Sequence, residues 1–461
     1  MRGRGNLGSA AEWGSQTVGQ AEAGPVACPR GRGLGGSGAI SAMAHVRGHG
    51  TVYDGWAASG APGWGFSDLL PYFWRSERVL GRDPALRGTV GPVAVAPVAE
   101  ADRHPVAVAF AEGLAQAGCP ATGDLSGEVQ EGVVWVDLAI TGGQRVSPAD
   151  ACVRPVPGRL NLVVEAGCLV TRLRVDHGRC AGVSYLRGGG PLRTQDGGEV
   201  IVCAGAAGSP QLLMLSGISP AGQLRGLGID LVAGVPAVGE NLQDHPIVMV
   251  SYATPSPRPA SRYNHGEVCA ALRSQCAGGY PDLHLFPILL PIAPARHQPP
   301  EAGYALVAAV VAPDNRGAVQ LVSADPRRAP LINPGFLSEP RDTDRLLEGL
   351  SLIRQAAASA TLSKLPQSEA WPGADVRASA ELRSYIRRTV ASYYHPAGTC
   401  RMGSGPGAVV GTQLGVHGLA GLRVADASVM PVLPNAHPNA TVLAIAERAA
   451  ELISGPVPAR R

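Results

Sequence analysis

The stretch Tyr393 to Ile453 reads YYHPAGTCRMG at 393–403 and GLRVADASVMPVLPNAHPNATVLAIAERAAELI at 421–453. Each segment holds a histidine, His395 or His437, directly before a proline, which pushes the histidine backbone out of the α region. After His437, apolar residues recur at helical spacing, and Asn439 or Thr441 can cap the helix. The stretch therefore predicts two histidines beside a helix N-terminus, where a general base has a positive helix end nearby.

Residue type alone does not establish a catalytic pair, because a histidine in a globular chain is more often structural or exposed than functional. The arrangement of His395 and His437 around one helix start is what favours catalysis. Cys400 is an alternative nucleophile close behind His395. No base for it is evident in the sequence, so we expect a packed thiol.

Three blocks of sequence, taken in order, resemble the glucose-methanol-choline (GMC) flavoprotein oxidoreductases. The C-terminal block is HPAGTCRMG with GLRVADASVMP and the helix that follows. The first family signature resembles Pro29 to Phe73, and the second resembles Gly205 to His245. The resemblance extends over nearly the whole chain from about Trp13 onward. Within the family, the sequence is choline dehydrogenase-like.

The resemblance implies an α/β (α+β) fold in two parts. One is a Rossmann-like FAD-binding domain, and the other is a substrate domain built on an antiparallel sheet flanked by helices. The implied FAD-binding domain is discontinuous and takes residues 1–50, 145–245 and 395–461. Residues 51–144 would be connecting helices and loops, and residues 246–394 the substrate-binding domain.

Gly33-Leu-Gly35-Gly36-Ser37-Gly38 matches the G-x-G-x-x-G dinucleotide pattern literally, yet no hydrophobic strand precedes it. In the family, this segment is instead the glycine-rich loop along the flavin, where glycines permit close backbone approach. Ile40 stands where some members attach flavin through a histidine, so noncovalent FAD is implied. Carried over from the family, the implied FAD contacts are Gly33, Gly35, Gly36, Ser37, Ser41, Ala42, Met43, Ala44, Val170, Ala204, Gly205, Asp426, Ala427, Asn439 and Thr441.

The beginning of the chain departs from the family pattern. Family members open with a strand, a G-x-G-x-x-G turn and a helix that hold the ADP half of FAD. Nothing before Trp13 resembles that unit. We therefore expect an N-terminally incomplete dinucleotide fold for the sequence as written, and weak FAD binding as its consequence.

Composition sets further limits. The chain has 461 residues, a hydrophobic content of 45% and a formal net charge of +3, with basic residues spread without blocks. These features give no nucleic-acid footprint. The sequence contains neither an apolar run long enough for a membrane span nor the apolar core of a signal peptide, which predicts a cytoplasmic location. Nine cysteines without a C-x-x-C pair predict reduced thiols, and we expect no metal site.

Local patterns predict individual elements. Helices are expected at 67–76, 106–117 and 343–358, and a short helix start at 41–44. Strands are expected at 161–167, 168–175, 180–186 and 199–203, followed by a turn, a capping Ser209 and Pro210 as the first helical residue. GYALVAAVVAP and GAVQLVSAD suggest antiparallel strands, residues 1–28 read as loop, and His284 is expected to be a structural histidine on a sheet.

The resemblance implies an FAD-dependent oxidoreductase that converts an alcohol to an aldehyde or ketone by hydride transfer to flavin N5. One of His395 and His437 would be the general base, and the other would hydrogen-bond the substrate oxygen. The sequence leaves open which histidine is which, which alcohol is used, and whether the electron acceptor is oxygen, a quinone or a carrier protein. A hydroxynitrile-lyase-like protein and a catalytically defective member of the fold remain alternatives.

Overall fold

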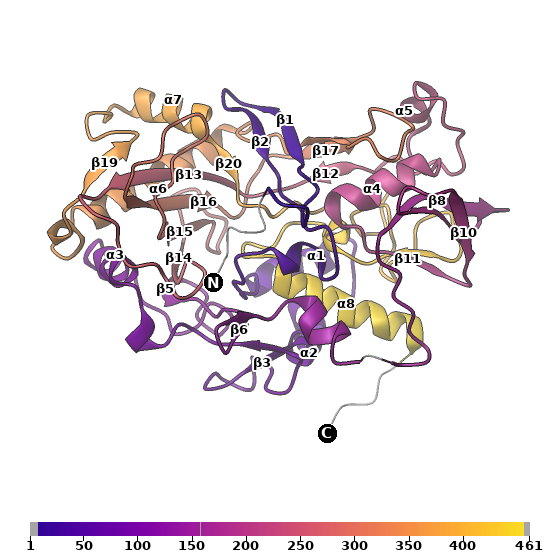
Figure 1. The fold of residues 1–461 in the computed structure, drawn as a ribbon, viewed down its shortest axis with the longest axis horizontal. Helices are drawn as coiled ribbons and strands as arrows, with labels where there is room; N and C mark the ends of the chain where they lie inside the picture. The colour runs from indigo at the N-terminus through magenta and orange to yellow at the C-terminus, as the bar shows by residue number, and fades with distance from the viewer. Residues whose placement is uncertain (1–7, 157, 456–461) are drawn as a thin grey trace.

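The computed structural model describes residues 8–156 and 158–455. Two groups of sheets organise this part of the chain, and they lie on opposite sides of Figure 1. A seven-stranded sheet lies on the left, and a parallel strand pair with a three-stranded meander lies on the right. The C-terminal helix α8 (Asn439–Ser454) starts between them.

The seven-stranded sheet is antiparallel, with the order β19-β13-β16-β15-β14-β5 and with β20 beside β13. Its central strands are near-continuous apolar runs because both of their faces are buried. The strands are β5 (Gly132–Trp135), β13 (Pro246–Ala253), β14 (Val268–Leu272), β15 (Leu283–Ile288), β16 (Gly303–Val310), β19 (Ser368–Trp371) and β20 (Ala391–Ser392).

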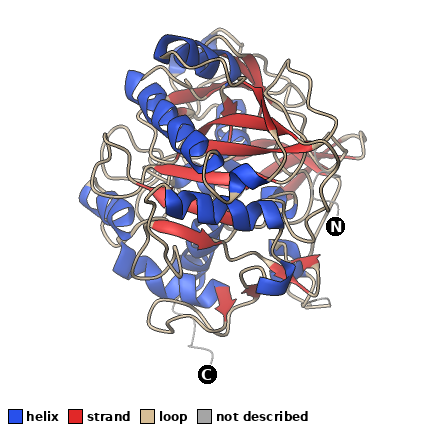
Figure 2. Cartoon of the chain, turned by 90° about the vertical axis from the view of Figure 1, so that its left-hand side faces the viewer, coloured by secondary structure: helices blue, strands red, loops and turns tan. Residues whose placement is uncertain are grey.

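Helices cover one face of this sheet, as Figure 2 shows. They are α3 (Pro105–Gln116), α6 (Pro340–Ala357) and α7 (Ser379–Thr389). Leu283 and Leu285 of β15 pack in the same core as these helices. Because side chains alternate along a strand, His284 between them points to the other face. Met249 and Phe286 lie on that other face, in a core that also takes in Ala436 just before α8.

The second region is built on two parallel strands, β11 (Val200–Val202) and β21 (Leu422–Val424). The meander β8 (Cys168–Asp176), β9 (Arg179–Arg187) and β10 (Leu192–Asp196) precedes them. Within the described residues, β11 pairs along one edge only. The helices whose residues share the core of this region are α1 (Gly50–Ala58), α2 (Phe66–Ser76), α4 (Gly205–Leu215), α5 (Ala221–Arg225) and α8.

The described residues also form smaller sheets, separate from these two groups. β12, β17 and β18 form a three-stranded sheet, and β1–β2, β3–β4 and β6–β7 form separate pairs. Their bounds are β1 (Gln16–Gln20), β2 (Gly24–Ala27), β3 (Glu77–Val79), β4 (Val93–Val95), β6 (Ile140–Thr141), β7 (Gln144–Arg145), β12 (Glu240–Leu242), β17 (Gly317–Gln320) and β18 (Leu331–Asn333).

The prediction of a loop over residues 1–28 is wrong where it can be tested, because β1 and β2 form a hairpin there. Residues 1–7 lie outside the described part. The hairpin is too polar to show an apolar period, and it is held by long-range contacts instead. The side chain of Gln20 donates to Asn333 Oδ1 and accepts from the backbone N–H of Phe336. Sequence periodicity does not record such contacts.

The helix after β11 also differs from its prediction, since α4 begins at Gly205 and places Ser209 and Pro210 inside it. Ser209 is not a cap at the predicted position, although its hydroxyl accepts from Ala204 N across the first turn. Pro210 has no N–H for the carbonyl of Ala206, four residues earlier. The hydroxyl of Thr399 donates to that carbonyl instead, at 2.6 Å. The proline is thereby accommodated within the helix.

Of the other local predictions, some are confirmed and some are wrong. The helices at 67–76, 106–117 and 343–358 are confirmed as α2, α3 and α6, and the strands at 168–175, 180–186 and 199–203 as β8, β9 and β11. The strand at 161–167 and the helix start at 41–44 are wrong, since both segments are irregular. GYALVAAV and GAVQ are strands β16 and β17, which belong to different sheets.

The predicted domain limits stay a prediction, and β5 from the segment predicted as a connection joins the seven-stranded sheet. In the described part of the chain, no helix has the length and apolar character needed to cross a membrane.

Candidate active site

Four histidines from distant parts of the chain meet between the seven-stranded sheet and the start of α8. His245 precedes β13, His284 lies in β15, His395 follows β20, and His437 precedes α8. Nδ1 of His245 lies 2.9 Å from Nδ1 of His395. The ring centroids of His395 and His437 are 5.2 Å apart, and those of His284 and His437 are 5.9 Å apart. The two predicted catalytic histidines are thus brought together, with two further histidines beside them.

The carboxylate of Asp244 holds two of these histidines in place. Its Oδ1 accepts the backbone N–H of His245 and that of His395, each at 2.8 Å. Its Oδ2 accepts the hydroxyl of Ser392. Burial raises the pKa of Asp244 to about 7, against the lowering effect of these three hydrogen bonds. The Asp244 carboxyl group therefore links the segment that carries His245 to the segment that carries His395.

All four imidazoles are neutral at neutral pH. Burial is the main cause in each case, because it penalises the charged form. It lowers the pKa of His245 to about 3 and that of His437 to about 4. The pKa values of His284 and His395 are also held well below the usual value, with the neighbouring histidines adding to the effect of burial. Such rings have a nitrogen lone pair available as a base.

The start of α8 leaves its positive end available to a ligand. Its N-cap residue is Pro438, and no described side chain caps the helix. The predicted caps are therefore wrong. Thr441 instead hydrogen-bonds Tyr53, with 2.8 Å between the hydroxyl oxygens, so its side chain serves the contact between α1 and α8. A Cβ added at Gly38 would lie 3.2 Å from Oδ1 of Asn439, which places the glycine-rich loop beside this helix start.

The glycine-rich loop has the backbone freedom that close approach to a ligand requires. Gly35 and Gly36 have φ values of 85° and 52°, and a Cβ at Gly33 or Gly36 would meet open space. After Gly35, residues 36–39 form a 3₁₀ turn. The loop then continues through Ser41, whose carbonyl accepts from Arg145. The remaining predicted residues of the loop are Ser37, whose hydroxyl accepts from Gly31 N, half-buried Ile40, exposed Ala42, and the buried Met43 and Ala44.

The turn between β11 and α4 presents an open backbone surface. Ala204 is exposed, and Gly205 has a φ of 76° with open space where a Cβ would lie. Asp426 supports this turn, because its carboxylate accepts from Gly205 N at 2.8 Å and from the hydroxyl of Ser209. Its other oxygen caps the short helix that begins at Ala427. The carboxylate is thus occupied within the protein, and any ligand contact here falls to the backbone.

Val170, the last predicted cofactor residue, lies on β8 and is 37% exposed. Cys400 is fully buried, and burial raises the pKa of its thiol. This agrees with the expectation of a packed thiol. None of the nine cysteines is in a disulfide.

Sequence reasoning did not assign His245 or His284 to the site. Their signals were weak: His245 follows Asp244 in a short connection, and His284 sits between two leucines in an apolar strand. The alternation in β15 does place His284 opposite the helix-covered face, but it does not show what that face meets. His284 is on a sheet, as expected, and it also faces the other histidines.

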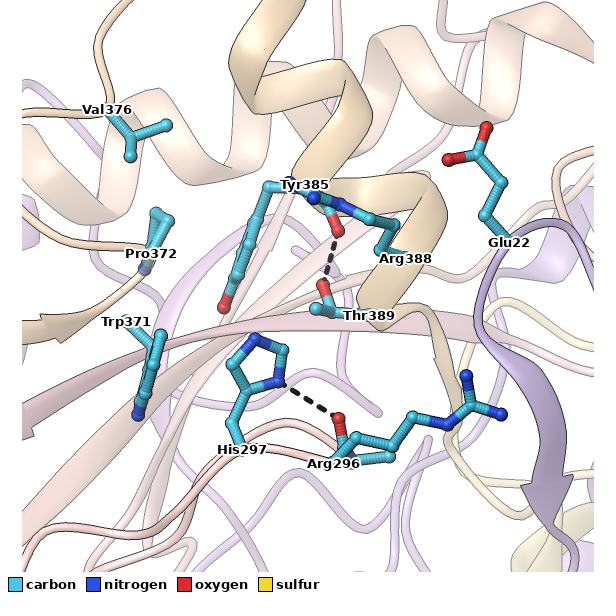
Figure 3. Close-up of a pocket in the computed structure, with 10 residues that line it drawn as sticks. Glu22, Arg296, His297, Trp371, Pro372, Val376, Tyr385, Arg388 and Thr389 are labelled. Carbon is cyan, nitrogen blue, oxygen red and sulfur yellow. Dashed lines mark hydrogen bonds between the residues drawn. The ribbon is translucent and has the colours of Figure 1, made fainter.

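A surface cavity of about 410 Å³ lies between α7, β19 and residues 295–297. Figure 3 shows the rings of His297, Trp371 and Tyr385 along its walls, with Arg388 and Thr389 beside them. None of its lining residues belongs to the histidine cluster or to the predicted FAD contacts.

Comparison with known proteins identifies the family. Two family models described as GMC oxidoreductase match residues 11–247 and 313–446. The chain is 36% identical to the mitochondrial choline dehydrogenase of Homo sapiens over 93% of this chain and 76% of that protein. It is 34% identical to an oxygen-dependent choline dehydrogenase of Photobacterium profundum, over 94% and 80%. The crystal structure of pyridoxine 4-oxidase from Mesorbium loti superposes with a TM-score of 0.91 at 33% identity, over 96% of this chain and 88% of that one.

The residues present fit FAD, the cofactor of this family, at three places. These are the open glycines of the 33–44 loop, the uncapped start of α8, and the exposed backbone at Ala204 and Gly205. Each offers backbone approach or N–H groups suited to phosphate or flavin oxygens. With the three signature blocks, the fold and the histidine pair in agreement, the chain belongs to the GMC oxidoreductases, a family of FAD-dependent enzymes.

Proposed function

We propose that this enzyme oxidises a small alcohol to the aldehyde or ketone, with His395 as general base and His437 as a hydrogen-bond partner of the substrate oxygen. The observation that carries the proposal is the 2.9 Å contact between Nδ1 of His245 and Nδ1 of His395. Two ring nitrogens at this distance share one proton, so one ring donates and the other accepts.

The surroundings of His245 indicate which ring donates. Nε2 of His245 is buried without a hydrogen-bond partner in the described chain, but the backbone carbonyls of Val311 and Pro434 act on this ring and favour its protonated form. Because Nδ1 of His245 faces His395, that proton belongs on Nε2. A neutral imidazole carries one proton, so Nδ1 of His245 accepts and Nδ1 of His395 donates. The lone pair of His395 then resides on Nε2, which hydrogen-bonds to no described residue.

Bound FAD would supply the hydride acceptor in this reaction. The chain would hold it with the 33–44 loop, Val170, the turn at Ala204 and Gly205, the backbone at Asp426 and Ala427, and Asn439 at the start of α8, without a covalent link. His395 takes the hydroxyl proton on Nε2 as the carbon gives up its hydride, so the alcohol loses two electrons and two hydrogens. A positioned base of this kind contributes roughly 10²–10⁴ in rate.

The sheet face that carries His284 favours an uncharged alcohol. Its core side chains are apolar, among them Met249 and Phe286. Two buried carboxyl groups in this part of the molecule already have partners: Asp244 makes the three hydrogen bonds described above, and Glu267 accepts from His104 N and from the hydroxyl of Ser261. A quaternary ammonium group placed there would lose its hydration without a free carboxylate to pair with. We infer that a neutral alcohol is used in preference to choline.

The test is turnover of an alcohol panel with an artificial electron acceptor, which avoids any assumption about the natural one. Benzyl alcohol, pyridoxine and choline compare neutral and cationic substrates. His395→Ala is compared with His177→Ala, a matched change at a fully exposed histidine. We expect turnover by the wild type and by His177→Ala, and a loss of roughly 10²–10⁴ in His395→Ala. No turnover of any alcohol, or equal turnover in the two variants, would refute the proposal.

A further inference from the structure

Tyr393 lies inside the histidine cluster and is held there by packing. Its backbone N–H donates to the carbonyl of His245 at 2.9 Å. Its ring stacks on Phe286, with centroids 4.8 Å apart and an angle of 6° between the planes. The centroid distances from this ring to His395 and His437 are 4.4 Å and 5.1 Å. This packing therefore fixes the position of the Tyr393 hydroxyl group among the imidazole rings.

That hydroxyl lies 3.0 Å from Nε2 of His437. It makes no other hydrogen bond with the described chain, and Nδ1 of His437 is buried without a partner there. If Tyr393 donates, Nε2 of His437 accepts and Nδ1 carries the proton, which leaves only the Nδ1–H unpaired. If His437 donates, both the phenol proton and the Nδ1 lone pair are unpaired. The first arrangement leaves fewer buried groups unsatisfied and is favoured.

A phenol is a donor at neutral pH only while it keeps its proton. Burial holds the pKa of Tyr393 well above its usual value, so the hydroxyl stays protonated. Burial lowers the pKa of His437 to about 4, so its ring is neutral and can accept one hydrogen bond on Nε2. Its remaining N–H is directed by the ring geometry to the side away from Tyr393.

We propose that Tyr393 is a positioning residue that fixes His437 as the Nδ1–H tautomer and so makes it the hydrogen-bond donor to the substrate oxygen. This inference rests on the proposed function. As His395 removes the hydroxyl proton, negative charge develops on the oxygen, and the Nδ1–H of His437 stabilises it. Bound FAD would supply the hydride acceptor. The unpaired donor of His437 acquires its partner only when substrate is present.

The direct test is ¹⁵N NMR of the FAD-bound protein with ¹⁵N-labelled histidine, since one- and two-bond couplings distinguish the two neutral tautomers. The His437 signals are assigned by their loss in His437→Gln. We expect the Nδ1–H pattern in the wild type and a shift toward the Nε2–H form in Tyr393→Phe, which removes only the hydroxyl. An Nε2–H pattern in the wild type, or an unchanged pattern in Tyr393→Phe, overturns the inference.

Kinetics give a second test. Tyr393→Phe should lower kcat about 10-fold or more with little change in the KM of the alcohol, because a developing charge loses its aligned donor. Tyr385→Phe is the matched control, since the hydroxyl of this α7 residue donates to the backbone carbonyl of Met249 on β13, outside the histidine cluster. If alcohol turnover depends on His395 but is unchanged in Tyr393→Phe, this inference alone is refuted. If turnover does not depend on His395, the proposed function is refuted.

Discussion

Replacing Asp244 by Asn tests the idea that burial makes ionisation of the carboxyl group between His245 and His395 costly. The amide oxygen of Asn can still accept both backbone N–H groups, and its NH₂ can donate to the hydroxyl of Ser392, so the shape is kept and the charge is removed. Burial raises the pKa of Asp244 from 3.8 to about 7. Between these values the folded chain binds more protons than the unfolded chain, so its stability falls as the pH rises through this window.

The size of the effect follows from that shift. Between about pH 5 and about pH 8, ionisation of Asp244 in the folded state should cost about 3 kcal/mol of unfolding free energy, which Asp244→Asn does not lose. Denaturant unfolding at both pH values measures the difference between variant and wild type. Asp196→Asn, with its side chain 80% exposed, is the control. The reasoning is refuted if the Asp244→Asn difference is the same at both pH values.

Three further predictions follow from named contacts. His395→Ala and His437→Ala should each lower turnover by at least about 10-fold while bound flavin changes little; wild-type turnover in both would contradict their assignment. Gly36→Val should reduce the ratio of flavin to protein after gel filtration, because φ is 52° there and the open space beside it is where FAD is expected; an unchanged ratio would count against that placement. Thr399→Val should lower the unfolding free energy by about 1–3 kcal/mol, because the carbonyl of Ala206 beside Pro210 loses its donor; a value near zero in denaturant unfolding would refute this.

The sequence predicted the long periodic elements and a site that brings His395 and His437 together, and it missed features that depend on distant contacts. His395 and His437 could be found because each precedes a proline and one adjoins a strongly periodic helix. The contact of Tyr393 with His437 could not, since it forms only through the packing of β20 against β13. The β1–β2 hairpin was missed for the same reason.

The start of α4 illustrates a different limit. Proline and serine in sequence are typical of a helix start, and the pattern at Ser209 and Pro210 predicted one there. The structure continues the helix through both because Thr399, from the histidine-bearing segment, donates to the carbonyl that Pro210 leaves free. A local rule was overridden by one side chain from far along the chain.

The most direct test of the central claim is anaerobic mixing of the FAD-bound protein with a neutral alcohol, followed by the visible absorbance of the flavin. The account predicts that the oxidised-flavin absorbance disappears, that the aldehyde forms in equal amount, and that His395→Ala slows this step by roughly 10²–10⁴. His177→Ala should bleach as the wild type does. A flavin that stays oxidised with every alcohol tested, or that bleaches equally fast without His395, would contradict it.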